Sequence, residues 1–160
     1  LATQRLLEAI RKVDLDRFVF ASSSSVYGQT AEVPTPESAP TRPHSPYGVT
    51  KLAAEHLCSA YAANFGVPVV NLRFFTVYGP RQRPDMAIRR LIDCAVRRTP
   101  FHVFGDGTQI RDFTYVGDVV AAMMQAATAD RICSMCTSTS ASCHCSVLMG
   151  VPTVTSISPG

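Results

Sequence analysis

Two apolar runs on either side of one long helical segment constrain the fold of this chain more than any other feature. Residues 17–21 (RFVFA) form a short run rich in β-forming residues. Residues 67–72 (VPVVNL) form a second, largely apolar run, typical of a strand that is buried on both faces of a parallel sheet. Between them, residues 46–64 are rich in alanine and have the apolar spacing of a helix. This order predicts a βαβ unit and an α/β fold.

The long helix carries start and stop signals. Pro46 suits the first helical position, Ser45 can cap the N-terminus, and Gly66 can end the helix. We expect its buried face to carry Leu52, Ala53, Leu57, Ala60 and Tyr61. Residues 28–46 before it hold five of the 11 prolines and no apolar period, which predicts a surface loop.

The rest of the chain predicts three more helices and two short strands. The helices are at 2–12, 86–98 and 118–127, and the strands are at 101–104 and 110–116. Asp85 can cap the helix at 86–98, whose inward face we expect to be Ile88, Leu91, Ile92 and Ala95. The chain opens on Leu1 with a helix already in course, so we expect it to begin inside a domain.

Residues 129–160 differ in composition from everything before them. Residues 132–160 contain no Asp, Glu, Lys or Arg, and Ser, Thr and Cys make up about half of them. This composition predicts a low-complexity tail with neither a packed helix nor a paired strand; a reading-frame error and a genuinely disordered tail both remain open. Its cysteines, Cys133, Cys136, Cys143 and Cys145, leave a zinc-binding protein as an alternative, but their spacing is short for a folded zinc module and we expect no metal site. Cys58 and Cys94 lie in helical patterns and read as buried apolar residues.

Composition and charge exclude several classes of function. The chain has 46% hydrophobic and 17% charged residues over 160 positions, as a soluble globular domain does. Its net charge is only +3, and its arginines gather between Arg73 and Arg111, which favours a small anionic ligand over nucleic acid. No stretch reaches the ~18 apolar residues of a membrane span, and the first residues lack a signal-peptide pattern. We therefore expect a cytoplasmic protein with no nucleic-acid or membrane partner.

Tyr47 and Lys51 stand four residues apart, so they share one face of the long helix. A tyrosine phenol is protonated at neutral pH, and a nearby ammonium group stabilises the phenolate that acts as a base. The spacing alone also fits a solvated helix face. A run of hydroxyls, Ser22 to Ser25, follows the first predicted strand, at the end of the sheet where ligands bind in open α/β folds. The two features together are more specific than either alone.

Four segments, in this order and spacing, carry a family resemblance: FVFASSSSVYG, SPYGVTK, LRFFTVYGPRQRPDMAI and FGDGTQIRDFTYV. They resemble the extended short-chain dehydrogenase/reductase family of sugar-nucleotide epimerases and dehydratases over residues 2–128. The resemblance implies a Rossmann-like, doubly wound parallel sheet, incomplete here and confined to its C-terminal part, with part of a small substrate-binding lobe. It also implies NAD as cofactor and a homodimer formed through the helices at 2–12 and 46–64.

The resemblance implies a role for each residue of the motifs. Tyr47 is the general base, Lys51 binds the nicotinamide ribose and favours the phenolate, and Ser23 hydrogen-bonds the reacting sugar hydroxyl. Tyr47, Lys51 and Ser22 are the implied cofactor contacts. Oxidation at C4 of a nucleotide sugar, turning of the 4-keto sugar and reduction on its other face then give the C4 epimer.

The remaining implied residues bear on the substrate. Ser24 and Ser25 stand where family dehydratases carry Asp-Glu, which favours epimerisation over dehydration. Thr76, Arg83, Ser24 and Ser25 resemble the group that holds a uronate carboxylate in UDP-glucuronate 4-epimerases, and a guanidinium suits that carboxylate. A surface role for Arg83, with UDP-glucose as the substrate, stays open. Arg111 resembles the arginine that contacts the nucleotide diphosphate, with a salt bridge to a neighbouring aspartate as the alternative.

The glycine-rich turn that opens the cofactor site of this family does not occur in the sequence. We therefore expect a fragment of an NAD-dependent UDP-sugar 4-epimerase, inactive on its own. A dehydratase or decarboxylase of the same family and a non-catalytic remnant of a broken gene remain alternatives.

Overall fold

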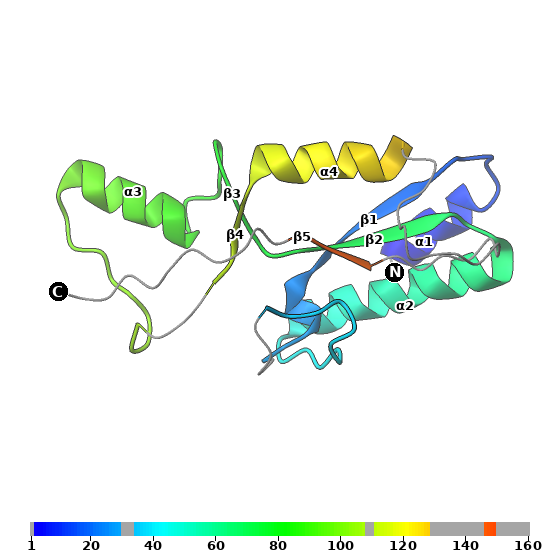
Figure 1. The fold of residues 1–160 in the computed structure, drawn as a ribbon, viewed down its shortest axis with the longest axis horizontal. Helices are drawn as coiled ribbons and strands as arrows, with labels where there is room; N and C mark the ends of the chain where they lie inside the picture. The colour runs from blue at the N-terminus through cyan, green and yellow to red at the C-terminus, as the bar shows by residue number, and fades with distance from the viewer. Residues whose placement is uncertain (1, 30–33, 108–110, 129–145, 150–160) are drawn as a thin grey trace.

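The computed structural model of the chain describes residues 2–29, 34–107, 111–128 and 146–149 (Figure 1). Its helices are α1 (Ala2–Ile10), α2 (Pro46–Phe65), α3 (Ala87–Arg97) and α4 (Val116–Thr128), with a short 3-10 turn, η1, at Ser24–Val26. Its strands are β1 (Phe18–Ser23), β2 (Val69–Phe74), β3 (Thr76–Tyr78), β4 (Phe113–Tyr115) and β5 (Ser146–Met149). The helices and strands alternate along most of the chain, as the α/β prediction requires.

The predicted βαβ unit is confirmed. β1 and β2 pair in parallel, from Phe18 opposite Val69 to Ser23 opposite Phe74, and α2 connects them. β1 is longer than predicted, because Ser22 and Ser23 continue the strand beyond the apolar run. β3 and β4 form a separate two-stranded parallel sheet, with Thr76 opposite Phe113. The serine run therefore lies at the carboxyl end of a parallel strand.

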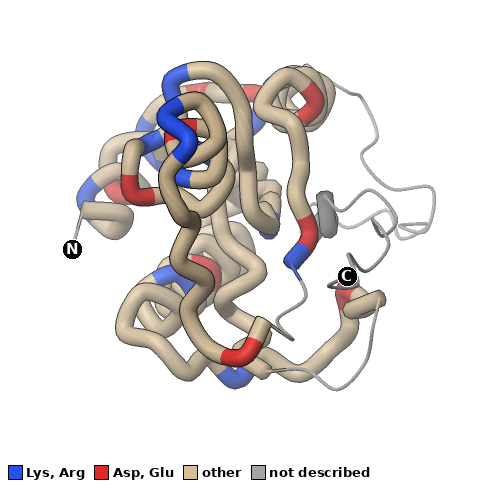
Figure 2. Tube along the Cα trace, turned by 90° about the vertical axis from the view of Figure 1, so that its left-hand side faces the viewer, with Lys and Arg blue, Asp and Glu red and all other residues tan. Residues whose placement is uncertain are grey.

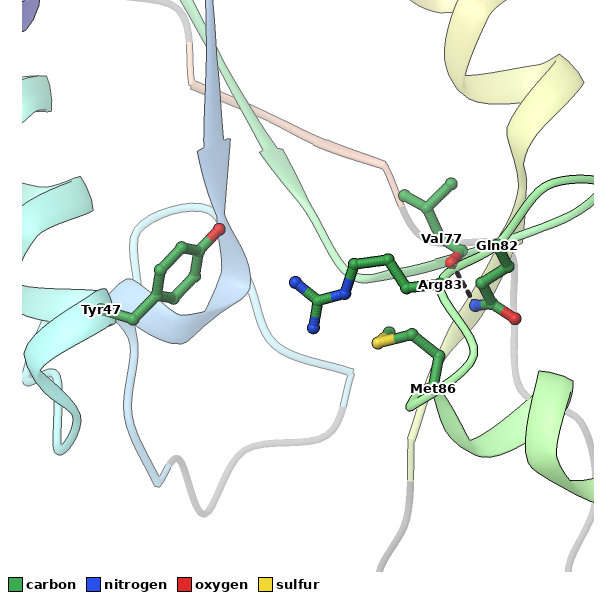
Figure 3. Close-up of a pocket in the computed structure, with 5 residues that line it drawn as sticks. All are labelled: Tyr47, Val77, Gln82, Arg83 and Met86. Atoms are coloured by element: carbon green, nitrogen blue, oxygen red, sulfur yellow. Dashed lines mark hydrogen bonds between the residues drawn. The ribbon is translucent and has the colours of Figure 1, made fainter.

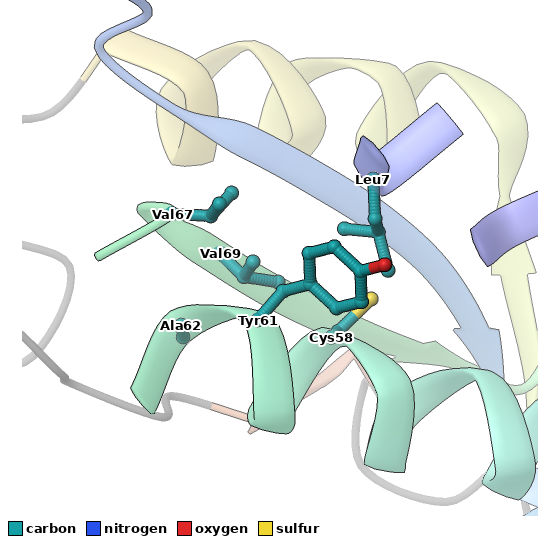
Figure 4. Close-up of a cluster of buried hydrophobic side chains, with 6 residues drawn as sticks. All are labelled: Leu7, Cys58, Tyr61, Ala62, Val67 and Val69. Atoms are coloured by element: carbon teal, nitrogen blue, oxygen red, sulfur yellow. The ribbon is translucent and has the colours of Figure 1, made fainter. Parts of the chain in front are cut away.

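Helices cover both faces of the larger sheet. On one face, α1 and α2 pack on the sheet through a buried cluster of Leu7, Cys58, Tyr61, Ala62, Val67 and Val69 (Figure 4). On the other face, Ala126 of α4 packs against Val70 and Leu72 of β2. Val69 of β2 thus faces one helical layer and Val70 and Leu72 face the other, which explains why apolar residues occur on both faces of the strand.

The ends of α2 confirm the predicted signals. The Ser45 hydroxyl accepts a hydrogen bond from the Gly48 N–H at 3.0 Å, and Gly66 ends the helix with φ 68°. The predicted buried face is wrong in part. Ala53 and Ala60 are exposed, and the buried stripe is instead formed by Ala54, Glu55, Cys58, Tyr61 and Ala62. The helix is rotated from the expected orientation because the Glu55 carboxylate is buried under it.

The prediction for α3 holds for its position and fails for its packing. The helix is capped by Met86 without a side-chain hydrogen bond, since the Asp85 carboxylate pairs with Arg83 instead. No residue of α3 is buried, and Leu91 and Ile92 are about half exposed (49% and 53%). The apolar stripe predicts the helix correctly, but it does not predict which segment packs against that stripe. The predicted strand at 101–104 is absent from this part of the described chain.

The cysteine prediction is confirmed for Cys58, which is fully buried. Burial and the nearby Glu55 charge raise the pKa of the Cys58 thiol to about 11, so the group stays protonated at neutral pH. Cys94 is only partly buried, with its sulfur 3.5 Å from the Pro100 carbonyl oxygen. The four cysteines of the tail, for which no metal site was expected, lie outside the described residues.

Part of the predicted tail forms a strand. Residues Ser146–Met149 pair in parallel with Asn71–Phe74 of β2, so the expectation of no paired strand is wrong for these four residues. The sequence Ser-Val-Leu-Met has enough β-forming character for pairing, which a composition averaged over the whole segment conceals. Residues 129–145 and 150–160 lie outside the described residues.

Charge, hydropathy and possible metal ligands can be surveyed for the described residues. Figure 2 shows basic and acidic residues in the same regions of the described chain. Among the described helices, none is both long enough and apolar enough to cross a membrane. Within the same residues, no group of three or more His, Cys, Asp or Glu side chains is arranged to hold a metal ion.

Candidate active site

The first turn of α2 packs directly against the end of β1 and the η1 turn. A Cβ atom on Gly48 would lie 2.5 Å from the Ser25 carbonyl oxygen and 2.9 Å from the Pro43 Cβ. Only glycine allows this approach without a shift of the backbone. The glycine between Tyr47 and Lys51 therefore lets the helix bring both residues next to the serine run.

Lys51 joins the helix to the end of β1. Its ammonium group donates a hydrogen bond to the Ala21 carbonyl oxygen at 2.8 Å. The same nitrogen lies 5.7 Å from the centre of the Tyr47 ring and 5.2 Å from the centre of the Phe20 ring. The predicted shared face of Tyr47 and Lys51 is confirmed, since the ammonium group lies within cation–π range of the Tyr47 ring.

Ser23 and Ser25 form a small hydroxyl pair beside this helix. The Ser23 hydroxyl donates to the Ser25 hydroxyl at 3.1 Å and accepts from the Ser25 N–H at 3.2 Å. Ser23 thereby caps η1, which contains Ser24 and Ser25. Since Gly48 contacts Ser25, the structure brings Ser23, Ser25, Tyr47 and Lys51 together as predicted.

Ser22 points away from this group. Its side chain is buried, and its hydroxyl donates to the Glu55 carboxylate under α2. Consecutive residues of a strand point to opposite faces, so Ser22 and Ser23 cannot both face a ligand. The Ser22 hydroxyl is therefore engaged under α2, and the predicted contact of Ser22 with the cofactor stays a prediction.

A buried ion pair lies under α2 and was not predicted from the sequence. The Arg73 guanidinium contacts the Glu55 carboxylate through Nη2 to Oε2 at 2.7 Å and Nε to Oε1 at 3.0 Å. Arg73 Nη1 also donates to the Tyr27 hydroxyl at 2.7 Å. Burial opposes the charged form of Arg73, but the bonds to Glu55 and Tyr27 raise the pKa of its guanidinium above the usual value. A glutamate three residues before Cys58 and seven before Ala62, in the buried stripe, was the available signal.

A pocket of about 520 Å³ adjoins Tyr47 (Figure 3). It is lined by Tyr47, Val77, Gln82, Arg83 and Met86. Figure 3 shows the Arg83 side chain extending between Tyr47 and Met86. The Gln82 amide donates to the Val77 carbonyl oxygen at 2.9 Å, which holds the loop that carries Arg83. The volume is within the range of small-molecule sites.

Asp85 holds the guanidinium of Arg83. The contacts are Nε to Oδ1 at 3.0 Å and Nη2 to Oδ2 at 2.7 Å, and both side chains are largely exposed. This pair lowers the pKa of the Asp85 carboxyl and raises that of Arg83. Arg83 thus binds the Asp85 carboxylate in a two-point geometry.

Neither Thr76 nor Arg111 lines this pocket: Thr76 begins β3 of the smaller sheet, and Arg111 precedes β4 by two residues. The Thr76 N–H donates to the carbonyl oxygen of Asp112, the residue after Arg111, at 3.1 Å. The loop from Thr76 to Arg83 stays close to α4, because a Cβ on Gly79 would lie 2.4 Å from Val116 Cγ1. Among the described contacts, none joins Thr76, Ser24 or Arg111 to Arg83.

The described residues fit the nicotinamide ribose end of NAD. Lys51 has three N–H donors, of which one is used on Ala21, and the Tyr47 hydroxyl has no hydrogen-bond partner among the described residues. Tyr47 is 56% exposed beside the pocket. A ribose, with two neighbouring hydroxyls, matches such a pair of unused polar groups.

The chain matches one protein family over most of its length. The profile of the family described as "NAD dependent epimerase/dehydratase family" matches residues 1–133. Among curated proteins, the "Uncharacterized UDP-glucose epimerase YtcB" of Bacillus subtilis is 57% identical over 119 residues, which are 74% of this chain and 37% of the relative. A UDP-glucuronate 4-epimerase of Thermodesulfobacterium geofontis is 41% identical over 117 residues, or 73% of this chain and 36% of the relative.

A solved structure agrees with these sequence matches. The crystal structure of the UDP-glucuronic acid 4-epimerase of Bacillus cereus, in complex with UDP-glucuronic acid and NAD, superposes with a TM-score of 0.76 at 51% identity. The match covers 81% of this chain and 41% of that one. The chain therefore spans about two-fifths of the length of the proteins that it resembles.

Proposed function

Because the chain belongs to the NAD-dependent epimerase/dehydratase family, we propose that its complete protein interconverts the C4 epimers of a UDP-sugar, with NAD as cofactor. UDP-glucuronate is the proposed substrate and UDP-glucose the alternative. One observation carries the proposal: the Lys51 ammonium lies between the end of β1 and the Tyr47 ring, next to a pocket that contains an arginine. This arrangement supplies a base, its stabilising cation and an anion-binding group in one place.

Each residue of the group has a proposed task at the sugar. Tyr47 removes the proton from the C4 hydroxyl, Ser23 holds that hydroxyl by a hydrogen bond, and Lys51 stabilises the phenolate and binds the ribose. Bound NAD would supply the acceptor for the C4 hydride and the donor for its return, and Tyr47 and Lys51 would hold its nicotinamide ribose. The protein orients the two reactants and provides the path for the proton, and exact placement of these side chains accounts for much of the rate.

Epimerisation is proposed over dehydration because the residues after Ser23 carry no carboxylate. Elimination of water needs a general acid and a general base, each worth roughly 10²–10⁴-fold. The positions that follow are Ser24 and Ser25, in η1. The Ser25 hydroxyl accepts from Ser23 and is placed to hold a ligand, but neither serine is suited to abstract a proton from carbon.

We propose that Arg83 binds the uronate carboxylate. Its substitution should therefore lower the rate with UDP-glucuronate more than the rate with UDP-glucose. For Arg83→Gln we expect kcat/KM for UDP-glucuronate to fall by about 10–100-fold, the worth of a hydrogen bond to a charged group. Conversion of UDP-glucose is expected to change by less than about threefold, since that sugar has no carboxylate. The assay is the initial rate on each UDP-sugar, with NAD, for the protein expressed from its complete coding region.

A matched control lies two residues away. Arg81 is exposed in the same loop and does not line the pocket, so Arg81→Gln removes one positive charge without touching the proposed carboxylate site. We expect it to leave both rates unchanged. Wild-type protein that converts UDP-glucose and leaves UDP-glucuronate untouched contradicts the proposed role of Arg83.

A homodimer through α1 and α2 is part of the proposal. Leu6 of α1 and Phe65 of α2 are about half exposed (49% and 51%), which leaves apolar surface on both helices. Arg11 lies over the Phe65 ring at 4.8 Å, so this surface also carries charge at its border. Apolar surface rimmed by charge is typical of protein interfaces.

A further inference from the structure

Two consecutive turns of α2 hold two consecutive residues of β1. Lys51 donates to the carbonyl oxygen of Ala21, and Glu55, one turn further along the helix, accepts from the hydroxyl of Ser22. Ser23, the next residue of β1, is the proposed contact to the sugar hydroxyl. The position of Ser23 relative to Lys51 thus depends on how the preceding two residues are attached to the helix.

Glu55 is itself held by Arg73, which is in turn attached to Tyr27. Arg73 of β2 holds both of its carboxylate oxygens, and Arg73 also donates to the Tyr27 hydroxyl, which follows η1. Arg73 lies 4.8 Å from the centre of the Tyr27 ring as well. Glu55 and Arg73 are both nearly fully buried, at 4% and 8% exposure. A buried charge moves only if its partners move with it, so this network resists a shift of the strand end.

We infer that Ser22, Glu55 and Arg73 are positioning residues: they fix the end of β1, and with it Ser23, against the turn of α2 that carries Lys51. The inference rests on the proposed function for the task of Ser23. It assigns to Ser22 a structural hydroxyl that faces away from the ligand. It also gives the buried ion pair a role in catalysis that is separate from its contribution to stability.

In this inference the network affects the reaction through the position of the Ser23 side chain. A side chain that is displaced by about 1 Å from its productive position can cost as much as 10²-fold in rate. Loss of the Ser22 hydroxyl releases one of the two attachments of the strand end and leaves Ser23, Tyr47 and Lys51 chemically intact. The rate of the chemical step is then affected, while binding of the nucleotide part of the substrate is not.

The test compares three variants. Ser22→Ala removes the hydroxyl, Ser22→Thr keeps it, and Tyr61→Phe removes the bond from the Tyr61 hydroxyl to Glu8, which also attaches α2 to a neighbouring element. Tyr61 lies ten residues beyond Lys51 and takes no part in the site. It therefore reports what the loss of an ordinary inter-helix hydrogen bond does. Thermal unfolding followed by circular dichroism shows that each variant is folded.

For Ser22→Ala we expect kcat to fall by about tenfold with KM changed by less than about twofold, since the group acts through placement alone. Ser22→Thr is expected to keep most of the rate, and Tyr61→Phe all of it. A purely structural role predicts that Ser22→Ala and Tyr61→Phe both lower the unfolding temperature and leave kcat unchanged. That result overturns the inference.

A second readout does not need turnover. The chain has two lysines, Lys12 and Lys51, and Lys12 is exposed, so it serves as an internal reference. Labelling with a limiting amount of an amine-specific acetylating reagent, followed by mass spectrometry, gives the ratio of Lys51 to Lys12 modification. We expect Ser22→Ala to raise this ratio several-fold as the Lys51 bond to Ala21 loosens, and Tyr61→Phe to leave it unchanged.

The two readouts separate failure of the inference from failure of the proposed function. If wild-type protein converts neither UDP-sugar, the proposed function is wrong, and the labelling ratio still decides whether Ser22 fixes the strand end. If wild-type protein is active and Ser22→Ala changes neither the ratio nor kcat, only the inference is wrong.

Discussion

Replacement of Tyr47 by phenylalanine is expected to lower kcat/KM for the UDP-sugar by about 10²–10⁴-fold, the usual worth of a general base. The change removes only the hydroxyl. The ring keeps its contact with the Lys51 ammonium, which lies 5.7 Å from its centre, and Tyr47 is more than half exposed, so folding should be unaffected. Steady-state kinetics give the rate, and calorimetric titration with UDP shows that nucleotide binding is retained within about threefold.

Tyr78 offers a matched control for this substitution. It lies in β3, its ring contacts Tyr115 at 5.7 Å between centres, and it does not line the pocket. Tyr78→Phe removes the same atom elsewhere in the fold and is expected to leave the rate within about twofold. A Tyr47→Phe variant that keeps more than about a tenth of the wild-type kcat/KM contradicts the proposed base.

Arg73→Met is expected to produce the largest loss of stability. It leaves the Glu55 carboxylate buried without its cation, and removal of one partner from a buried pair typically costs about 3–5 kcal/mol of the free energy of unfolding. Arg73 also donates to the Tyr27 hydroxyl, which is then left with only its own bond to the Glu37 carbonyl oxygen at 3.4 Å. Urea denaturation measures the change, with the slope of the transition as a check that unfolding remains two-state.

An exposed pair of the same chemistry supplies the comparison. Arg89 and Asp93 pair at 3.1 Å, four residues apart on α3, and Arg89→Met should cost no more than about 0.5 kcal/mol. Replacing both Glu55 and Arg73 by methionine is expected to recover much of the loss, because no unpaired charge then remains. Equal effects for Arg73→Met and Arg89→Met contradict the account of the buried network.

The sequence predicts the βαβ core well because its signals are local. The Ser45 cap, Pro46 in the first turn and the Gly66 stop are each determined by a few neighbouring residues, and all three are confirmed. The pairing of β1 with β2 follows from two apolar runs and a connecting helix. The packing of β2 between two helical layers explains why apolar residues occur on both of its faces.

What the sequence does not predict depends on contacts between distant segments. α3 is amphipathic, yet no described residue covers its apolar stripe, so its expected inward face is exposed. Glu55 reads as a surface charge until Arg73, 18 positions later, is placed beside it. The four-residue strand β5 follows from a partner edge that composition cannot reveal.

The candidate site divides in the same way. The joint placement of Ser23, Tyr47 and Lys51 follows from the strand end and the helix spacing, and the structure agrees. The sequence predicts Ser22 in the same site as Ser23. Successive side chains of a strand point to opposite faces, however, so the side chains of these two residues cannot both face that site. Arg83 lies in the pocket beside Tyr47, while Thr76 lies in β3 and Arg111 just before β4, and neither lines the pocket.

The central claim, that Ser23, Tyr47 and Lys51 serve a reversible oxidation at C4, is tested most directly with UDP-glucuronate that carries deuterium at C4. The protein expressed from its complete coding region is incubated with this substrate and NAD in ordinary water, and the epimer is examined by NMR. The account predicts that the C4 epimer forms with its deuterium retained at C4, since the hydrogen removed there returns to the same carbon. An epimer that has gained hydrogen from the solvent at C4, or a product of elimination, would contradict it.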